Sequence, residues 1–326
     1  MNVLITGATG FVGSHTAERL IASGHSVRAL VRKSSSLEWL QDKPIEIVYG
    51  TLSNPESLQD ALKDIDTVIH IAGVVAAKNR LAFYEGNHIA TRGLLEACKQ
   101  YGTELKRFIF ISSQTAGGPS LDGIPVTEET PPHPITTYGR SKLAAEEECK
   151  NFEQYFPVTI LRLPAIYGPR DTATLSFFQA IGRRIKPLIG FKNKFVNLCY
   201  VGDIALAIEC AMLAPAAANR LYYIGSKENY SWQELSGVAA EVMKKRGVFI
   251  RIPHSVVATI AGISELLSVF KTRPSVLNWE KRLDMTAQYW TCSIERAERE
   301  LGYTPQVSIQ RGFSETVEWY REKKWM

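Results

Sequence analysis

The stretch Asn2-Val-Leu-Ile-Thr-Gly7-Ala-Thr-Gly10-Phe-Val-Gly13 decides the fold. Its apolar start predicts a strand over residues 2–6, and apolar residues at helical spacing predict a helix over 12–23. In such a strand–loop–helix, the glycines allow a tight turn, close approach of a pyrophosphate and close packing of helix on strand. We therefore expect a dinucleotide here, contacted by Gly7, Thr9, Gly10, Phe11, Val12 and Gly13.

Working outward from this loop, short β-branched runs alternate with helical patterns, which is typical of βαβ units. Strands are predicted at residues 2–6, 26–31, 46–49, 67–71, 108–112 and 158–162. Helices are predicted at residues 12–23, 55–63, 83–101 and 138–153. The pattern favours the α/β class, with a Rossmann-like doubly wound parallel sheet.

After residue 162 the pattern is less regular because prolines and glycines interrupt it. It predicts strands at 195–201 and 221–224 and helices at 203–213, 232–245, 254–270 and 294–301. We expect residues 1–165, joined again by 195–225, to form an NAD(P)-binding domain. Residues 166–194 and 226–326 would form a smaller substrate-binding cap at the carboxyl edge of the sheet, where ligands of such folds bind.

Composition narrows the classes of partner. The 38 basic and 33 acidic residues give a net charge of +5 and are scattered along the chain, so no nucleic-acid partner is expected. The five cysteines form no CxxC pair, and no histidine stands near them at metal-ligand spacing, so we expect reduced thiols and no metal. Without a leader pattern, and with the apolar stretch 256–270 shorter than the ~20 residues of a membrane span, we expect a cytoplasmic protein and no span.

The end of the second predicted strand reads Leu30-Val31-Arg32-Lys33-Ser34. An acidic residue at this place would bond the ribose 2′-hydroxyl of NAD. Here cations stand instead, and they could hold a 2′-phosphate through charge-assisted hydrogen bonds. The cofactor is therefore predicted to be NADP, held by Arg32, with NAD as the alternative if Arg32 and Lys33 only form a solvated turn.

Tyr138-Gly-Arg-Ser-Lys142 places a phenol and an ammonium on one face of a helix. A phenol that works near neutrality needs its pKa lowered by about three units, or ~4 kcal/mol. One ammonium at ~4 Å in an effective dielectric of ~20 supplies about that much. Ser113 ends an apolar strand at the same edge and could bond a substrate oxygen. The alternative is a core tyrosine beside a solvated lysine.

Together with this glycine loop, the sequences His70-Ile-Ala72-Gly, Leu161-Arg-Leu-Pro164-Ala-Ile166-Tyr-Gly and Tyr200-Val-Gly-Asp203 resemble the extended short-chain dehydrogenase/reductase family. That family is also described as the NAD-dependent epimerase/dehydratase family. The pattern is similar to its 3β-hydroxysteroid dehydrogenase and dihydroflavonol reductase members, and the resemblance spans nearly the whole chain.

The resemblance implies roles for single residues. Tyr138 would transfer the hydroxyl proton, Lys142 would also bond the nicotinamide ribose, and Ser113 would steady the substrate oxygen. Asn87 would support the helix that carries Tyr138, whereas His70 is interpreted as structural. The cofactor contacts implied beyond the glycine loop and Arg32 are Thr51, Leu52, Ala72, Asn87, Tyr138, Lys142, Pro164 and Ile166. Such proteins tend to form homodimers, and Leu94, Leu95, Leu143 and Ala144 are compatible with that.

The expected function is hydride transfer to or from a carbonyl or alcohol of modest size and mostly apolar character. The stretch Ser113-Gln-Thr-Ala116 lacks the acidic pair of dehydratases, and Ala165 and Val196 replace residues that hold a sugar-nucleotide diphosphate. A nucleotide-sugar epimerase is the alternative if a cation of the cap replaces the missing arginine. The candidates are Arg183, Arg184, Lys186, Lys192 and Lys194. A non-catalytic NADP sensor is a lesser alternative.

Overall fold

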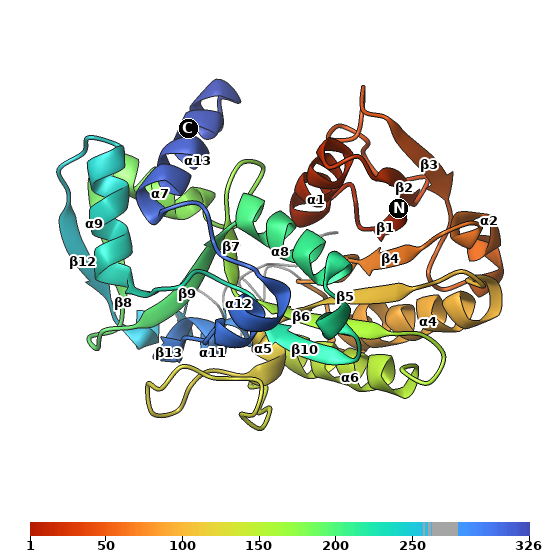
Figure 1. The fold of residues 1–326 in the computed structure, drawn as a ribbon. Coiled ribbons are helices and arrows are strands. Elements are labelled where there is room, and N and C mark those ends of the chain that lie inside the picture. The colour runs from red at the N-terminus through yellow and green to blue at the C-terminus, as the bar shows by residue number, and fades with distance from the viewer. Residues whose placement is uncertain (257, 260–261, 263–279) are drawn as a thin grey trace.

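Seven strands form the main sheet of the computed structural model, which describes residues 1–256, 258–259, 262 and 280–326 (Figure 1). They are β1 (Asn2–Thr6), β2 (Ser26–Val31), β3 (Ile45–Tyr49), β4 (Thr67–His70), β5 (Arg107–Ser113), β6 (Val158–Leu163) and β10 (Arg220–Tyr223). Their order is β10-β6-β5-β4-β1-β2-β3, and every neighbouring pair is parallel. The chain starts in the middle and winds outward both ways, which confirms the predicted doubly wound fold.

Helices cover both faces of this sheet. On one face lie α1 (Phe11–Ala22), α8 (Val201–Leu213) and α12 (Glu295–Leu301). On the other lie α2 (Gln59–Leu62), α4 (Ala90–Tyr101) and α6 (Thr137–Asn151). Val3 and Ile5 pack into the first layer and Leu4 into the second. Since successive strand side chains point to opposite faces and both faces are covered, the strands are mainly apolar, with a few buried polar side chains such as Ser112 and Arg162.

Short elements connect these layers. They are η1 (Pro55–Leu58), α3 (Arg80–Tyr84), the π-helical turn η2 (Glu85–Ile89), α5 (Gln114–Gly117) and η3 (Pro215–Ala217). α3 and η2 lead into α4, and α5 follows β5 directly. α3, η2 and α5 therefore lie where the chain leaves the carboxyl edge of the sheet.

The C-terminal part contains two smaller sheets, which lie at the opposite side of Figure 1 from β2 and β3. In one, β9 (Phe195–Tyr200) pairs with β7 (Ala165–Tyr167), β11 (Asn229–Ser231) and β13 (Tyr289–Trp290). In the other, β8 (Ile185–Ile189) pairs only with β12 (Val248–Ile252). The helices here are α7 (Leu175–Gly182), α9 (Trp232–Val242), α11 (Lys281–Thr286) and α13 (Ile309–Glu322).

The predicted return of residues 195–225 to the first domain describes only part of this segment. α8 packs with α1 and β10 extends the main sheet beside β6, as expected. β9 instead lies in the second sheet, because its partners β7, β11 and β13 all come from the C-terminal part. The helix predicted over residues 254–270 falls largely outside the described residues.

Two of the residues considered for a dimer interface, Leu94 and Leu95, are unsuited to that role. Leu94 and Leu95 are fully buried in the chain's own core, beneath α4 and against the main sheet. They point inward because the apolar stripe of α4 covers the sheet. The homodimer itself stays a prediction.

In the described parts of the chain, no helix is long and apolar enough to cross a bilayer. Across the same residues, no three His, Cys, Asp or Glu side chains gather into a group that could hold a metal ion.

Candidate active site

The loop between β1 and α1 requires glycine at two places. Gly7 has a φ of 76°, and a Cβ there would lie 2.7 Å from the amide nitrogen of Ala72. At Gly13 a Cβ would lie 2.1 Å from the carbonyl oxygen of Gly7. α1 begins after Gly10 with no side-chain cap, which leaves its first N–H groups open to an anion. This cradle fits the pyrophosphate of a dinucleotide.

The other predicted cofactor residues follow the carboxyl ends of neighbouring parallel strands. Arg32 comes directly after β2 and is exposed, and Thr51 follows β3, where its Oγ1 lies 2.9 Å from Oγ of Ser53. Further along, Leu52, Ala72, Pro164 and Ile166 are partly buried. Because the carboxyl ends of parallel strands meet at one edge, the fold gathers these residues on the same side of the sheet as the glycine loop.

Tyr138 and Ser113 meet at this edge. Ser113 ends β5, Tyr138 lies in the first turn of α6, and the Ser113 hydroxyl is close enough to Tyr138 to affect its pKa. Burial raises the pKa of Tyr138 to about 12; the Ser113 hydroxyl opposes this shift and the Asp284 carboxylate adds to it. The predicted lowering by Lys142 is therefore wrong for this structure, because burial of the phenolate dominates. The hydroxyl of Tyr138 stays protonated near neutral pH.

Lys142 lies one helical turn beyond Tyr138 and is buried. Its Nζ donates to the carbonyl oxygen of Ile111 at 2.7 Å and lies 4.0 Å from the centre of the Phe110 ring. Burial lowers the pKa of Lys142 to about 8, while the charge of Glu146 opposes that shift. The ammonium is thus directed to the backbone of β5, which explains why it does not activate the phenol as the spacing suggested.

Asn87 lies in η2, where the sequence predicts an uninterrupted helix over residues 83–101. Its Oδ1 accepts from the amide of Val74 at 2.7 Å, and its Nδ2 donates to Val74 O at 3.0 Å and Ser141 Oγ at 2.9 Å. These bonds replace the regular helix locally, and π turns of this kind are frequent at functional sites. Both amide protons are used, so Asn87 acts on the site by holding α6 against the loop after β4.

A buried ionic network lies beneath the site. Arg162 of β6 donates twice to Glu146 of α6, at 3.0 and 2.7 Å, and Ser112 Oγ donates to the same carboxylate at 2.5 Å. Arg162 also donates to the hydroxyl of Tyr223 at 2.9 Å. Since Glu146 follows Lys142 by one turn, the network fixes this part of α6 on β5 and β6.

His70 is structural, which confirms the interpretation made from the sequence. Its Nδ1 lies 2.7 Å from Oγ1 of Thr6 and its Nε2 lies 3.0 Å from Oγ1 of Thr91. Burial lowers the pKa of His70 to about 3. The ring is therefore neutral and joins β4 to β1 and α4.

Two carboxylates at the start of α6 come from the far end of the chain, and sequence analysis identified neither. Glu280 accepts from the amide and from Oγ1 of Thr137, both at 2.7 Å. Asp284, in α11, is close enough to Tyr138 to raise its pKa. No local pattern marks these residues, because they reach the site only through the tertiary fold.

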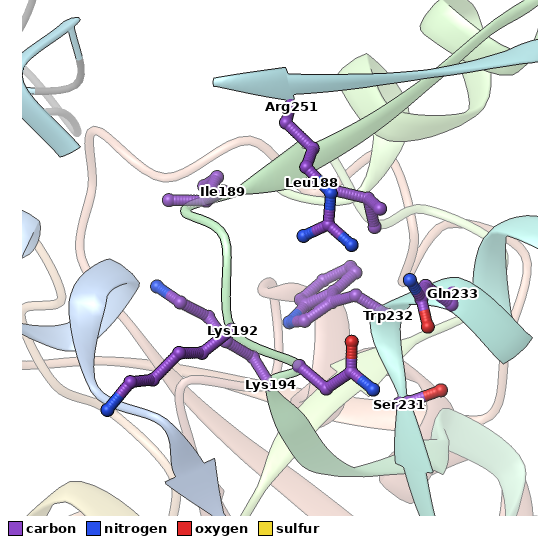
Figure 2. A pocket seen from close by; sticks show the side chains of 9 residues that line it. Leu188, Ile189, Lys192, Lys194, Ser231, Trp232, Gln233 and Arg251 are labelled. Carbon is purple, nitrogen blue, oxygen red and sulfur yellow. The ribbon is translucent and has the colours of Figure 1, made fainter. Parts of the chain in front are cut away.

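Of the cap cations considered for a diphosphate, Lys192 and Lys194 line a small pocket at the start of α9, together with Arg251 (Figure 2). Figure 2 shows the guanidinium of Arg251 above Trp232, while Lys192 and Lys194 extend away from that ring. Lys194 Nζ donates to the carbonyl oxygen of Met285 at 2.5 Å, and Arg251 donates to that of Phe191 at 2.8 Å. The cavity of about 10 Å³ has room for about one water.

Comparison with known proteins agrees with this arrangement. The model of the NAD dependent epimerase/dehydratase family matches residues 3–225. Ceramide reductase of Caulobacter vibrioides is 30% identical over 99% of this chain and 96% of its own length. Human sterol-4-alpha-carboxylate 3-dehydrogenase is 26% identical over 97% of this chain and 87% of its own length.

Two solved structures show the same fold over nearly the whole chain. The crystal structure of gox2253 has a TM-score of 0.83 at 28% identity and covers 99% of both chains. UDP-glucose 4-epimerase of Thermotoga maritima has a TM-score of 0.81 at 23% identity, over 99% of this chain and all of its own. This chain therefore belongs to the NAD-dependent epimerase/dehydratase family and is an enzyme of the extended short-chain dehydrogenase/reductase type.

Proposed function

We propose that this enzyme reduces the carbonyl group of a mostly apolar substrate with NADPH, using Tyr138 as the proton donor. The observation that carries the proposal is the position of Tyr138 and Ser113 at the carboxyl edge of the sheet, where the Ser113 hydroxyl is close enough to Tyr138 to affect its pKa. With a pKa of about 12, Tyr138 keeps its proton at neutral pH, which is the state that a reduction needs.

Each side chain of the pair has a separate task. The nicotinamide cofactor, when bound, would supply the hydride. Ser113 Oγ would donate to the carbonyl oxygen and stabilise its developing negative charge. Tyr138 would then protonate that oxygen. Lys142, held on Ile111 O, would bond the nicotinamide ribose and place the cofactor beside Tyr138. A protonated phenol and an oxyanion donor at one point are what carbonyl reduction requires.

Preference for NADP is supported by the end of β2. Arg32 and Lys33 are exposed there, and within the described residues neither is paired with a carboxylate. No acidic side chain follows β2 to repel a 2′-phosphate. Arg32 is therefore available for a charge-assisted bond to that phosphate.

An apolar substrate is supported by the names of relatives. Besides ceramide reductase, they include a 2-alkyl-3-oxoalkanoate reductase of Shewanella oneidensis, 26% identical. For a nucleotide-sugar, the replaced position Val196 is buried in β9, and two cations of the small pocket, Lys194 and Arg251, are bonded to backbone carbonyls. A diphosphate would lack bidentate partners worth about 1.5–3 kcal/mol each.

A thermal-shift screen of the NADPH complex tests the substrate class. UDP- and dTDP-sugars would be compared with long-chain β-keto amides, steroidal ketones and aromatic ketones. We expect stabilisation by apolar ketones, followed by NADPH oxidation with the same compounds. Stabilisation by a nucleotide-sugar alone would support the alternative hypothesis of a nucleotide-sugar epimerase and contradict the proposed reduction of an apolar ketone.

A further inference from the structure

One face of the β8–β12 pair consists only of apolar side chains. Residues in register on paired strands point to the same face, and Val248 is in register with Ile185, Ile250 with Pro187 and Ile252 with Ile189. Val248 is 67% exposed, Ile250 44% and Ile185 36%. The opposite face, with Lys186 and Leu188, lines hollows against α9. The apolar face is therefore turned away from α9 except at Ile189, which lines the small pocket at the start of that helix.

Five cations gather where the two strands begin. Because the strands are parallel, both start at one end, and each follows a basic run: Arg183-Arg184 after α7 and Lys244-Lys245-Arg246 after α9. The amide of Val248 donates to the carbonyl oxygen of Arg184 at 3.1 Å, which brings the runs together. All five side chains are exposed, and no carboxylate of the described chain pairs with them.

The same end of the pair is hollowed rather than flat. A shallow hollow of about 510 Å³ lies between Lys186, α9 and the run Lys244–Arg246. Glu241 is its one carboxylate among the described lining residues. Some of these cations have a structural reason, because they follow the C-termini of α7 and α9 and helix C-termini favour cations. The helix C-termini do not account for the apolar face, whose exposure costs about 25 cal/mol per Å² in water.

We propose that this ribbon surface, the apolar face of β8–β12 with its five cations, docks the protein on an anionic lipid membrane. Apolar side chains would enter the boundary between headgroups and acyl chains, while the arginines and lysines would meet lipid phosphates. The apolar face and the cations are both needed to favour a membrane. Exposed apolar residues alone would fit many partners, and cations alone would fit any polyanion.

The charge of the ribbon surface favours a membrane over a second copy of the chain as its partner. A two-fold contact through this surface would place the same patch against itself. The patch carries five cations and one carboxylate, so two copies repel each other, whereas a layer of lipid phosphates is complementary. Docking goes beyond the proposed reaction and does not depend on it, although an apolar substrate would be found at such a surface.

Vesicle flotation of the full-length protein with bound NADP tests the docking. Vesicles of phosphatidylcholine alone are compared with equimolar phosphatidylcholine and phosphatidylglycerol. We expect binding to the second only. The triple variant K244Q/K245Q/R246Q should bind about a hundredfold more weakly, at ~1 kcal/mol per basic residue. V248S/I250S should lose about tenfold or more through its apolar contacts.

The matched control is R321Q/K323Q/K324Q, which removes three exposed cations at the end of α13 and should bind as the unchanged protein does. Circular dichroism and NADPH affinity verify that each variant is folded. The proposal is overturned by equal binding to neutral and anionic vesicles, by an equal loss in the control, or by V248S/I250S converting a dimer to a monomer with no vesicle binding in either form.

Discussion

Tyr138 is the residue on which the proposed chemistry depends, because its hydroxyl is the proposed proton donor and the Ser113 hydroxyl is close enough to affect its pKa. Tyr138→Phe removes the transferable proton and leaves the ring in place. We expect turnover to fall by about 10²–10⁴, the usual value of a positioned acid, with NADPH affinity nearly unchanged. Stopped-flow reduction and calorimetric titration measure the two. Tyr155→Phe, at an exposed tyrosine, is the control; full activity of Tyr138→Phe would remove Tyr138 from the mechanism.

Arg32 is the residue on which the proposed preference for NADP depends. Arg32→Ala should weaken NADPH binding by about 10- to 100-fold, the value of one charge-assisted hydrogen bond of ~1.5–3 kcal/mol. NADH affinity should not change, because its ribose carries no 2′-phosphate. Calorimetric titration of both cofactors is the measurement, with the exposed Arg321→Ala as the control. Equal loss for NADPH and NADH would show that Arg32 does not recognise the 2′-phosphate.

His70 acts between elements, since its ring bridges β1, β4 and α4. Its pKa is about 3 in the folded chain and about 6.5 when unfolded. Below about pH 6.5 the unfolded chain therefore binds a proton that the folded chain does not, and stability falls. Above about pH 6.5 the contribution of neutral His70 to the free energy of unfolding is fully present.

At about pH 5 the loss from His70 is on the order of 2 kcal/mol relative to neutral pH. Urea unfolding of the unchanged protein and of His70→Gln at both pH values separates this part, since the variant should lose less on acidification. His25→Gln is the control. An equal pH dependence in His70→Gln would assign the acid sensitivity to other groups.

Helices and strands whose signals lie in their own residues could be predicted from the sequence. Those that depend on contacts with residues far away in the sequence could not. The glycine loop, α1 and α6 carry their own signals, such as the glycine turn and Thr136, whose Oγ1 accepts from the amide of Gly139. The π turn at Asn87 was missed because its cause is a bond to Val74, outside the helix. β9 was expected with the main sheet because apolar alternation does not reveal which strand is its neighbour.

At the scale of the whole molecule, the site is completed by the C-terminal part of the chain. The glycine loop and the side chains proposed for catalysis were predicted from their spacing, because the carboxyl edge of a parallel sheet gathers them. Glu280 and Asp284 were not, since they approach α6 from a segment that folds back over the sheet's edge. The electrostatics of Tyr138 therefore depend on a contact that no sequence pattern contains.

Substitution of Glu280 tests whether the contact between the C-terminal part and the start of α6 matters for activity. It accepts two hydrogen bonds from Thr137, directly before Tyr138, and lies 3.4 Å from the guanidinium of Arg140. In Glu280→Ala the start of α6 loses both bonds, of about 1 kcal/mol each, so we expect a lower kcat with unchanged NADPH affinity and faster amide exchange at Thr137. Glu280→Gln keeps an acceptor and should recover part of the rate, while Glu322→Ala, at an exposed glutamate, should be neutral. If Glu280→Ala kept full kcat while exchange at Thr137 rose, the clamp would serve stability and not the orientation of Tyr138.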